Sequence, residues 1–287
     1  MEEKGTLYLC ATPLGNLKDI TLRVLEVLKE VDLIAVEDTR RTVKLLNHYD
    51  IKTPMISYHE HNKESRGREI MECLQEGKKI ALAADAGTPG ISDPGYELIR
   101  DTIEKGIEVI SLPGPCAAVT AVVVSGFPIK RFAFYGFLSN KKKDRKRELE
   151  GISQEDKTVV IYEAPHRLLK TLKELAEFME NREAALCREL TKVHEEVKRG
   201  TIKELISHYE VNPLKGEITL AIKPPAREEE VSSYNLGEGV REVKELKEEG
   251  LREGEAVKRI ARYFKLPRRE LYKKVIEDKE KEEGKNK

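Results

Sequence analysis

The sequence predicts an α/β protein built from two α/β domains and a small helical segment after them. Short apolar, β-prone runs alternate with segments whose apolar residues repeat at helical spacing. Such alternation is typical of a largely parallel sheet covered by helices. The chain has 287 residues, more than the roughly 100–200 residues of a usual single domain, so two domains are expected.

The first α/β domain is expected over residues 1–138. It opens with the apolar run TLYLCA, which predicts a strand at 6–11. Pro13, Gly15 and Asn16 then predict a loop, and a helix follows because apolar residues return at helical spacing from Leu22 onward. Further strands are predicted at 33–36, 79–83, 108–112 and 132–135.

A change in composition marks the start of the second domain. The run NKKKDRKRELE at 140–150 is strongly basic and lacks glycine, so we place the boundary beside it and assign residues 139–225 to the second domain. Alternation then resumes, with strands predicted at 158–162, 184–187 and 217–222 and helices at 166–179 and 202–209.

Residues 226–287 are expected to form a linker and a helix-turn-helix-like segment. The acidic stretch REEE at 227–230 is typical of a linker. Between 254 and 276 the apolar positions predict two helices, separated by a break at Lys265, Leu266 and Pro267. The last residues, rich in lysine and glutamate, are expected to fray.

Composition argues against several classes of protein. Lys and Arg number 52 and so do Asp and Glu, so any basic surface for a polyanion must be local. Cys10, Cys73, Cys116 and Cys187 form no CxxC pair, which argues against a zinc site or a disulfide framework. No apolar run approaches the roughly 20 residues of a membrane span, and the N-terminal residues do not resemble a signal peptide. We therefore expect a cytoplasmic protein with no metal and no membrane association.

Three loops rich in glycine and proline each follow a predicted strand: TPLGN at 12–16, DAGTPGISDPG at 85–95 and PGPCA at 113–117. Open α/β sheets bind ligands at the carboxyl ends of their strands. For TPLGN alone a plain connector is the favoured interpretation. The eleven residues of DAGTPGISDPG exceed what a strand-to-helix connection requires, so a functional role is expected there. No loop matches GxxxxGK[ST] or GxGxxG, which argues against P-loop nucleotidases and ordinary Rossmann dehydrogenases.

Five motifs, TPLGNLKDIT, AVEDTRRT, DAGTPGISDPG, LPGPCA and YEAPHR, closely resemble in their order those of the tetrapyrrole (corrin and porphyrin) methylase superfamily. Within it they resemble the ribosomal small subunit methyltransferase I branch, which 2′-O-methylates a cytidine of 16S ribosomal RNA. The resemblance covers about residues 5–225, and 254–276 resembles that branch's small helical domain. It implies S-adenosyl-L-methionine in a cleft between two α/β domains, a homodimer, and 16S rRNA of the small ribosomal subunit as substrate.

The resemblance also implies which residues bind the cofactor. The long loop would contribute Asp85, Gly87, Thr88, Ile91, Ser92 and Asp93. The next loop would contribute Pro113, Gly114, Pro115, Cys116 and Ala117. These would surround the methionine and ribose portions, while Pro13 and Tyr162 would close the pocket. Cys116 stands where many relatives have serine, so only a backbone contact is expected to persist there.

Methyl transfer to a ribose hydroxyl requires in-line positioning and a group that accepts the proton. The catalytic candidates are Asp38, Glu163 and His166, and His59 and His61 are further candidate bases. The structural alternatives are a helix cap for Asp38, an ion pair with Arg167 for Glu163, and ordinary loop histidines for His59 and His61.

RNA binding requires cationic contacts to phosphates. The candidates best placed by sequence are Arg40, Arg41, Lys141, Lys142, Lys143, Arg145, Arg147, Arg167 and Arg188. Arg40, Arg41 and Arg167 rank first because they lie in the family-like motifs. The basic run at 140–147 is explained equally well as a solvated loop. The basic residues of the C-terminal segment, Lys258, Arg259, Arg262, Arg268 and Arg269, fit RNA docking or a helical appendage that packs on the dimer.

Two other functions stay open from the sequence. One is methylation of a tetrapyrrole carbon, but the EDTRRT and YEAPHR motifs and the basic C-terminal segment favour RNA. The other is a non-catalytic ribosome assembly factor with a similar pocket, against which the intact glycine-rich loops argue.

Overall fold

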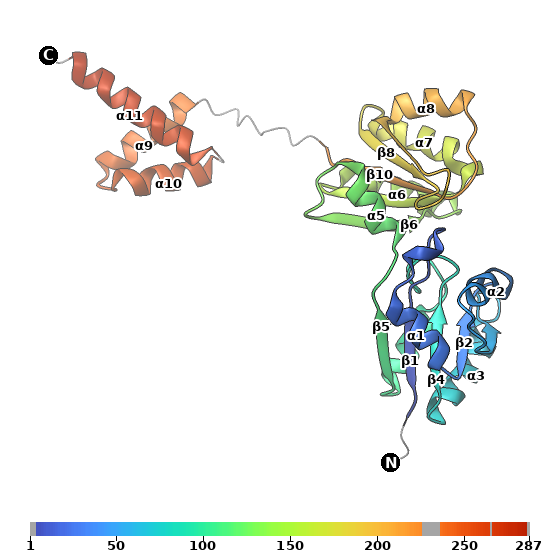
Figure 1. The fold of residues 1–287 in the computed structure, drawn as a ribbon. Coiled ribbons are helices and arrows are strands. Elements are labelled where there is room, and N and C mark those ends of the chain that lie inside the picture. The colour runs from blue at the N-terminus through green and yellow to red at the C-terminus, as the bar shows by residue number, and fades with distance from the viewer. Residues whose placement is uncertain (1–3, 226–235, 265, 286–287) are drawn as a thin grey trace. The chain divides into compact units, whose positions relative to one another are not determined.

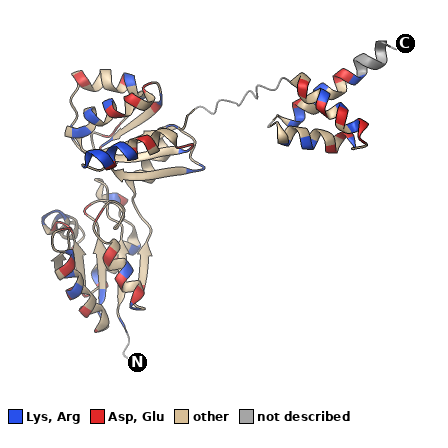
Figure 2. Ribbon diagram, turned by 180° about the vertical axis from the view of Figure 1, so that it is seen from behind, with Lys and Arg blue, Asp and Glu red and all other residues tan. Residues whose placement is uncertain are grey.

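The computed structural model describes residues 4–225, 236–264 and 266–285, which belong to two compact units (Figure 1). The first unit comprises residues 1–224 and the second 225–287. Charged residues lie mainly on the helices of both units, whereas the strands are mostly uncharged (Figure 2). This distribution is expected because the strands form the interior of the first unit.

The first unit contains two five-stranded sheets, of which the first is entirely parallel. Its strand order is β3-β2-β4-β1-β5. The strands are β1 (Thr6–Cys10), β2 (Leu33–Val36), β3 (Met55–Ser57), β4 (Lys79–Ala83) and β5 (Glu108–Leu112). Every position of β2 and β4 after the first is buried, as expected for strands covered on both faces. Four of these strands were predicted, and the three-residue β3 was not.

Helices cover both faces of this sheet. Cys10 and Ala83 face one apolar cluster with α1 (Leu22–Glu30) and α2 (Thr39–His48). Leu7 and Leu82 face another with α3 (Lys63–Gln75) and α4 (Tyr96–Glu104). A single 3-10 turn, η1 (Leu17–Asp19), precedes α1. The alternation of side chains along each strand therefore divides the core into two layers.

The second sheet is mixed, with the order β6-β7-β10-β8-β9. Its strands are β6 (Phe132–Phe137), β7 (Thr158–Glu163), β8 (Glu183–Arg188), β9 (Glu196–Thr201) and β10 (Ile218–Ile222). Strand β6 runs parallel to β7, whereas β10 runs antiparallel to both of its neighbours, β7 and β8, and β9 runs antiparallel to β8. Strand β9 was not predicted from the sequence, because its residues are mostly polar and only partly buried.

Helices α6 (Lys142–Gln154), α7 (Pro165–Met179) and α8 (Ile202–Val211) share one apolar cluster with the second sheet. Helix α5 (Ala117–Ser125) packs through Ala118 and Val122 against Val160, in a separate cluster. The chain thus passes from the first sheet to the second between β5 and α5.

This crossing differs from the boundary expected at 138/139, because the strand predicted at 132–135 pairs with β7 in the second sheet. The basic run that suggested the boundary is not a loop. It forms the start of α6, whose Leu149 and Ile152 are buried in the core.

The second unit is a bundle of α9 (Leu236–Glu248), α10 (Glu253–Tyr263) and α11 (Arg268–Lys285) around its own apolar core. The helix, turn and helix expected between 254 and 276 are therefore present. Leu266 is buried in the turn, and its amide donates to the carbonyl of Ala261 at 2.9 Å. The acidic linker expected at 227–230, Lys265 of the expected break and the chain end at 286–287 lie outside the described residues. No helix in the described parts is both long and apolar enough to cross a bilayer.

Candidate functional site

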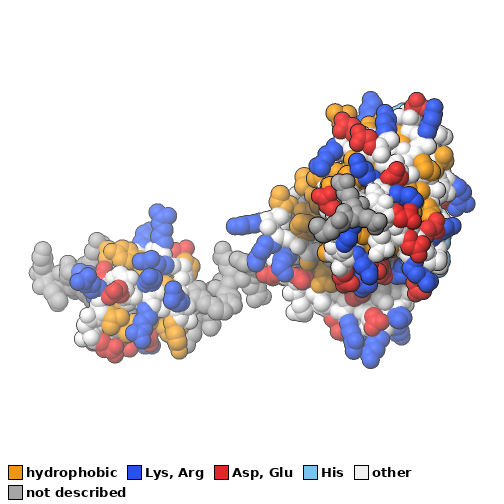
Figure 3. All heavy atoms as spheres, turned by 90° about the horizontal axis from the view of Figure 1, so that it is seen from below, with side chains coloured by type: hydrophobic (Ala, Val, Ile, Leu, Met, Phe, Trp, Pro, Cys, Tyr) orange, Lys and Arg blue, Asp and Glu red, His pale blue; other side chains and the backbone are white. Residues whose placement is uncertain are grey.

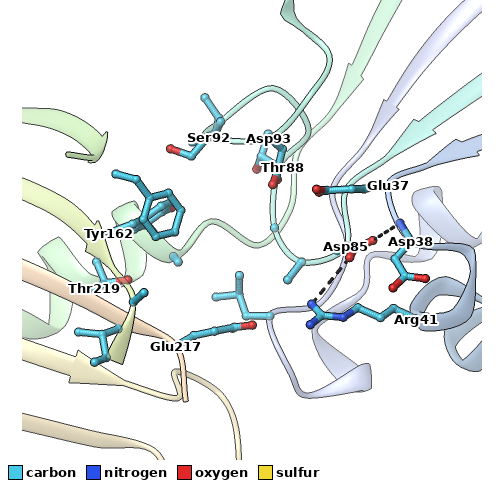
Figure 4. Close-up of a pocket in the computed structure, with 18 of the residues that line it drawn as sticks. Glu37, Asp38, Arg41, Asp85, Thr88, Ser92, Asp93, Tyr162, Glu217 and Thr219 are labelled. Carbon is cyan, nitrogen blue, oxygen red and sulfur yellow. Dashed lines mark hydrogen bonds and ion pairs between the residues drawn. The ribbon is translucent and has the colours of Figure 1, made fainter. Parts of the chain in front are cut away.

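A pocket of about 820 Å³ lies where the strands of the first sheet end (Figure 4). Each of the five strands is followed by a loop that lines it. The contributions are Leu14 after β1, Glu37 and Asp38 after β2, His59 and His61 after β3, 85–88 and 91–93 after β4, and Cys116 after β5. The carboxyl ends of parallel strands share one edge, which is why residues so distant in sequence meet here.

The opposite wall comes from the second sheet. Phe137 ends β6, Tyr162 and Glu163 end β7, and Thr219 lies at the start of β10. Because β10 is antiparallel to β7, its first residues lie at the edge where β7 ends. Residues 164, 165 and 216–218 complete this wall.

Tyr162 joins the two walls. Its hydroxyl accepts a hydrogen bond from the backbone N–H of Ala118 at 3.1 Å, at the beginning of α5. Its ring lies edge-on to Phe134 and Phe137, with centroid distances of 4.9 and 5.6 Å. Burial raises the pKa of Tyr162 to about 12, so the hydroxyl stays neutral at physiological pH. Tyr162 therefore lines the pocket and contacts the beginning of α5.

The glycine-rich loop after β4 is fixed by the loops on either side. Gly87 and Thr12 exchange two backbone hydrogen bonds of 2.9 Å each. The Thr88 hydroxyl donates to the carbonyl of Pro115 at 3.0 Å. Gly87 has φ +90°, which L residues rarely adopt, and its N–H and C=O are already paired with Thr12. Gly87 thus lets the loop bend, and Ser92, further along the same loop, also has a positive φ of 62°.

Besides Asp38 and Glu163, the carboxylates of Glu37, Asp85, Asp93 and Glu217 line the pocket (Figure 4). Burial, followed by the negative charges of Glu37, Asp85 and Glu217, raises the pKa of Asp93 to about 7. Burial and then Asp85 raise the pKa of Glu37. The pocket interior is therefore negative, which favours a cationic ligand. No group of three or more His, Cys, Asp or Glu side chains suited to a metal ion occurs within the described ranges.

Asp85 is held at the rim by two contacts. Its Oδ1 accepts the backbone N–H of Asp38 at 2.9 Å, and its Oδ2 lies 3.7 Å from Nη1 of Arg41. This pairing ties the loop after β4 to the beginning of α2. It also places a cation at the mouth of the negative interior.

The predicted catalytic residue Asp38 caps α2. Its carboxylate accepts hydrogen bonds from the backbone N–H of Arg40 and from Nε and Nη2 of the same residue, at 2.9 to 3.0 Å. These bonds lower the pKa of Asp38 to about 2. A carboxylate this acidic is a poor proton acceptor at neutral pH, so the structural alternative fits better.

The predicted catalytic residue Glu163 belongs to a buried ion-pair network. Its side chain is 0% exposed and lies 3.2 Å from Nε of Arg167 and 3.7 Å from Nη2 of Arg145. The Thr171 hydroxyl and the backbone N–H of Ala164 donate to it. Glu163 thus fixes the end of β7 against α6 and α7, which is the alternative stated above. His166 is exposed on α7 and does not line the pocket.

The predicted RNA-binding arginines divide into two groups. Arg40 and Arg41 line the pocket and are 89% and 65% exposed. Arg145 is only 7% exposed and also pairs with Glu174 at 2.6 Å, so burial contradicts an RNA contact for it. Arg167 donates to Asn140 and to the carbonyl of Leu138 and is mostly enclosed. Lys141, Lys142 and Lys143 are exposed at the beginning of α6 but do not line the pocket.

Most of the residues implied to bind the cofactor line the pocket, namely Asp85, Gly87, Thr88, Ile91, Ser92, Asp93, Cys116, Ala117 and Tyr162. Pro13, Pro113, Gly114 and Pro115 do not line it. A Cβ on Gly114 would lie 2.7 Å from Cβ of Ala11, so that glycine lets two loops pack together.

Several lining residues were missed, chiefly Leu14, Glu37, Phe137 and the stretch 216–219. Glu37 lies inside the AVEDTRRT motif, so the sequence could have indicated it as a site residue. For the stretch 216–219 the sequence shows only a glycine before a strand, because this stretch reaches the pocket only through the antiparallel placement of β10.

The two-sheet fold is that of solved methyltransferases. A solved structure of this fold is the uroporphyrin-III C-methyl transferase from Thermus thermophilus complexed with S-adenyl homocysteine. It has a TM-score of 0.57 and 15% sequence identity, covering 76% of this chain and 97% of that chain. The family described as Tetrapyrrole (Corrin/Porphyrin) Methylases matches residues 6–206, and the chain belongs to this family. The predicted fold class and family are confirmed.

The relatives to which this chain is similar include proteins named ribosomal RNA small subunit methyltransferase I. The protein from Halalkalibacterium halodurans is 47% identical over 274 residues, which are 94% of this chain and 94% of the relative. The protein from Thermotoga maritima is 49% identical over 218 residues, which are 76% of this chain and 98% of the relative.

Proposed function

We propose that the protein transfers a methyl group from S-adenosyl-L-methionine to the 2′-hydroxyl of a cytidine ribose in 16S rRNA of the small ribosomal subunit. The observation that carries this proposal is the negative pocket at the strand ends of a methylase-family fold. High identity to relatives named for an activity on small-subunit rRNA supports RNA as the substrate.

The pocket suits the proposed cofactor. Its volume of about 820 Å³ lies within the range of about 300–1,000 Å³ typical of small-molecule sites. Apolar side chains of Leu14, Ile91 and Phe137 offer surface for an adenine ring. The carboxylates favour the sulfonium and ammonium charges. Bound S-adenosyl-L-methionine supplies a methyl group on a positively charged sulfur.

Asp93 is the proposed proton acceptor. A general base works best when its pKa lies near the working pH, and the pKa of Asp93 is about 7. Asp93 removes the 2′-hydroxyl proton as the oxygen takes the methyl group, so a 2′-O-methyl ribose, S-adenosylhomocysteine and a protonated carboxyl result. The rigid wall of Tyr162 and Phe137 holds the reacting groups in line and excludes water.

Arg40 and Arg41 are the proposed RNA contacts at the pocket mouth, because both are exposed there beside Asp38 and Asp85. Lys141, Lys142 and Lys143 extend the basic surface at the beginning of α6. Arg145 is not among the proposed RNA contacts, because its guanidinium is buried and paired with Glu174.

A homodimer is proposed from the character of α5. Its sequence AAVTAVVVS is apolar on all sides, as in a helix that is buried all round. Val119 and Val123 are nevertheless 50% and 62% exposed. A second copy of the chain covers this face. All four cysteines are free thiols, in keeping with a reducing cytoplasm, the proposed compartment.

Transfer of a labelled methyl group tests the function. The purified protein is incubated with labelled donor and with naked 16S rRNA, small subunits or a uroporphyrin-type tetrapyrrole, and the product is mapped. We expect label on a cytidine 2′-oxygen. Label on the tetrapyrrole alone would favour methylation of a tetrapyrrole carbon, and donor binding without transfer would favour a non-catalytic assembly factor.

A further inference from the structure

Charge in the second unit is segregated along the chain. Residues 258–274 contain eight Lys or Arg and one Glu, whereas 238–255 contain seven Glu and four Lys or Arg. In Figure 3 Lys and Arg side chains gather on the visible face of this unit, and Asp and Glu lie mostly along one edge. A nearly neutral unit therefore has one strongly basic part.

The basic residues beside the turn have no acidic partners among the residues that the structure describes. Lys258, Arg259, Arg262, Arg268 and Arg269 are all exposed. None of them makes an ion pair with another residue in the described parts of the chain. Elsewhere in the unit lysines do pair, as Lys247 does with Glu253 at 2.6 Å. These five residues, together with Tyr263 and Tyr272, are called the basic turn surface below.

The packing of α10 and α11 makes this surface continuous. On α10 the core side holds Val257 and Ile260, so the cations at 258, 259 and 262 lie on the opposite side. Pro267 and the buried Leu266 hold the turn, and α11 begins directly afterwards at Arg268. The last turn of α10 and the first turn of α11 are thus neighbours in a fixed geometry.

Two exposed tyrosines lie among these cations. Tyr263 is 78% exposed and Tyr272 is 46% exposed. Aromatic rings next to Lys and Arg are typical of surfaces that bind unpaired bases and their phosphates, because rings stack on bases while cations contact the backbone.

The pocket lies in the first unit and does not use this surface. The Thermotoga maritima relative is matched over 98% of its length by 218 residues, close to the 224 residues of the first unit. This relative, named ribosomal RNA small subunit methyltransferase I, is therefore about as long as the unit that contains the pocket. The second unit therefore contributes a property other than methyl transfer.

We propose that the basic turn surface is a second RNA-docking site, which binds phosphates and bases of the RNA that the first unit methylates. This proposal rests on the proposed function for the identity of the RNA. It assigns the five cations to phosphate contacts and the two tyrosines to stacking, and it leaves methyl transfer to the pocket.

The test compares two double variants of the full chain that each remove two positive charges from the second unit. Arg259→Gln/Arg262→Gln alters the basic turn surface. Arg241→Gln/Arg252→Gln is the matched control, because both residues are exposed but lie in the acidic part. Glutamine forms helices well, and circular dichroism checks that both variants keep the bundle.

Filter binding to naked 16S rRNA over a range of salt concentrations gives the result. At about 0.1 M salt each lost phosphate contact weakens binding by about eightfold, and the slope of log K against log salt falls by about 0.7–0.9. We expect both effects in the basic variant and neither in the control. In the transfer assay KM for RNA rises while kcat and donor affinity stay unchanged.

Tyr263→Ala and Tyr263→Phe separate stacking from charge. We expect Ala to weaken RNA binding by about fivefold or more without changing the salt slope, and Phe to bind like the native chain. Equal affinity and slope in the basic variant and the control would overturn the proposal. So would loss of self-association in the basic variant with RNA affinity unchanged, because the surface would then be a protein interface. If the native chain methylates no RNA, the proposed function fails, while filter binding still decides the docking site.

Discussion

Asp38 and Asp93 show how neighbours decide what a carboxyl group can do. Arg40 lowers the pKa of Asp38 to about 2, whereas burial and three other carboxylates raise that of Asp93 to about 7. From the sequence, Asp38 was a catalytic candidate with helix capping as its alternative, and Asp93 was expected to bind the cofactor. The charges around Asp93 come from distant parts of the chain, and only the fold brings them together.

The pH dependence of activity tests Asp93. Because the base must be ionised, we expect kcat/KM to rise as pH increases through about 7 and to level off above it. Asp93→Asn should lower kcat by about 10²-fold or more and remove this rise, since general base catalysis contributes about 10²–10⁴-fold. Asp156→Asn, at an exposed position, is the control. An unchanged profile in Asp93→Asn would assign the proton transfer to another group.

The pH dependence of stability gives a second test of the raised pKa of Asp93. Its folded pKa of about 7 lies above the ordinary value of 3.8, so the folded state loses stability as pH rises from about 4 through 7. Asp93→Asn should therefore be more stable than the native chain at pH 8, by about 1–2 kcal/mol after screening, and the advantage should shrink toward pH 4. Denaturant unfolding at several pH values checks this, and a pH-independent difference would contradict it.

Glu163 is expected to matter for folding. Glu163→Gln leaves Arg145 and Arg167 without their shared charge partner, and breaking a buried ion pair costs about 3–5 kcal/mol. Glu177→Gln, exposed on the same helix α7, should change the free energy of unfolding by less than about 0.5 kcal/mol. A stable Glu163→Gln protein without activity would instead return Glu163 to the catalytic group.

At the scale of elements, the sequence predicted eight of the ten strands in the described residues and missed β3 and β9. Apolar runs such as 79–83 and 158–162 stand out because both sides of the strand need apolar residues. Strand β9, EVKRGT, lies at the edge of the second sheet and is only partly buried, so it carries no such signal. The sequence also did not indicate which strands pair, because periodicity does not show which sheet a strand joins.

The apolar helix α5 gives a test of the homodimer. Val123→Lys places a charge on its exposed face, and we expect sedimentation analysis to show monomers where the native chain shows dimers. Val211→Lys is the control, because Val211 is 76% exposed at the end of α8. A dimer that survives Val123→Lys would show that α5 does not form the interface.

At the scale of the whole molecule, a balanced charge conceals local asymmetry. The totals of 52 basic and 52 acidic residues gave no reason to expect a polyanion partner. The structure separates a negative pocket from exposed arginines at its mouth and from a basic turn in the second unit. Ordered motifs identified the family and most lining residues, but they did not reveal the wall formed by 216–219.

The two units have separate cores, which leads to a prediction for a shortened chain. A protein that ends at Pro224 should bind the methyl donor with native affinity, because every lining residue of the pocket lies before that point. Calorimetric titration checks this. A donor affinity more than tenfold weaker would show that the second unit supports the pocket.

The place of β10 in the second sheet has a consequence for synthesis. This strand is the last of its sheet along the chain, yet it lies between β7 and β8 and pairs with both. A nascent polypeptide therefore cannot assemble the sheet's middle until residues 218–222 have emerged from the ribosome. Since 216–219 also line the cavity, the enzyme acquires its binding competence in one late event and does not mature gradually during translation.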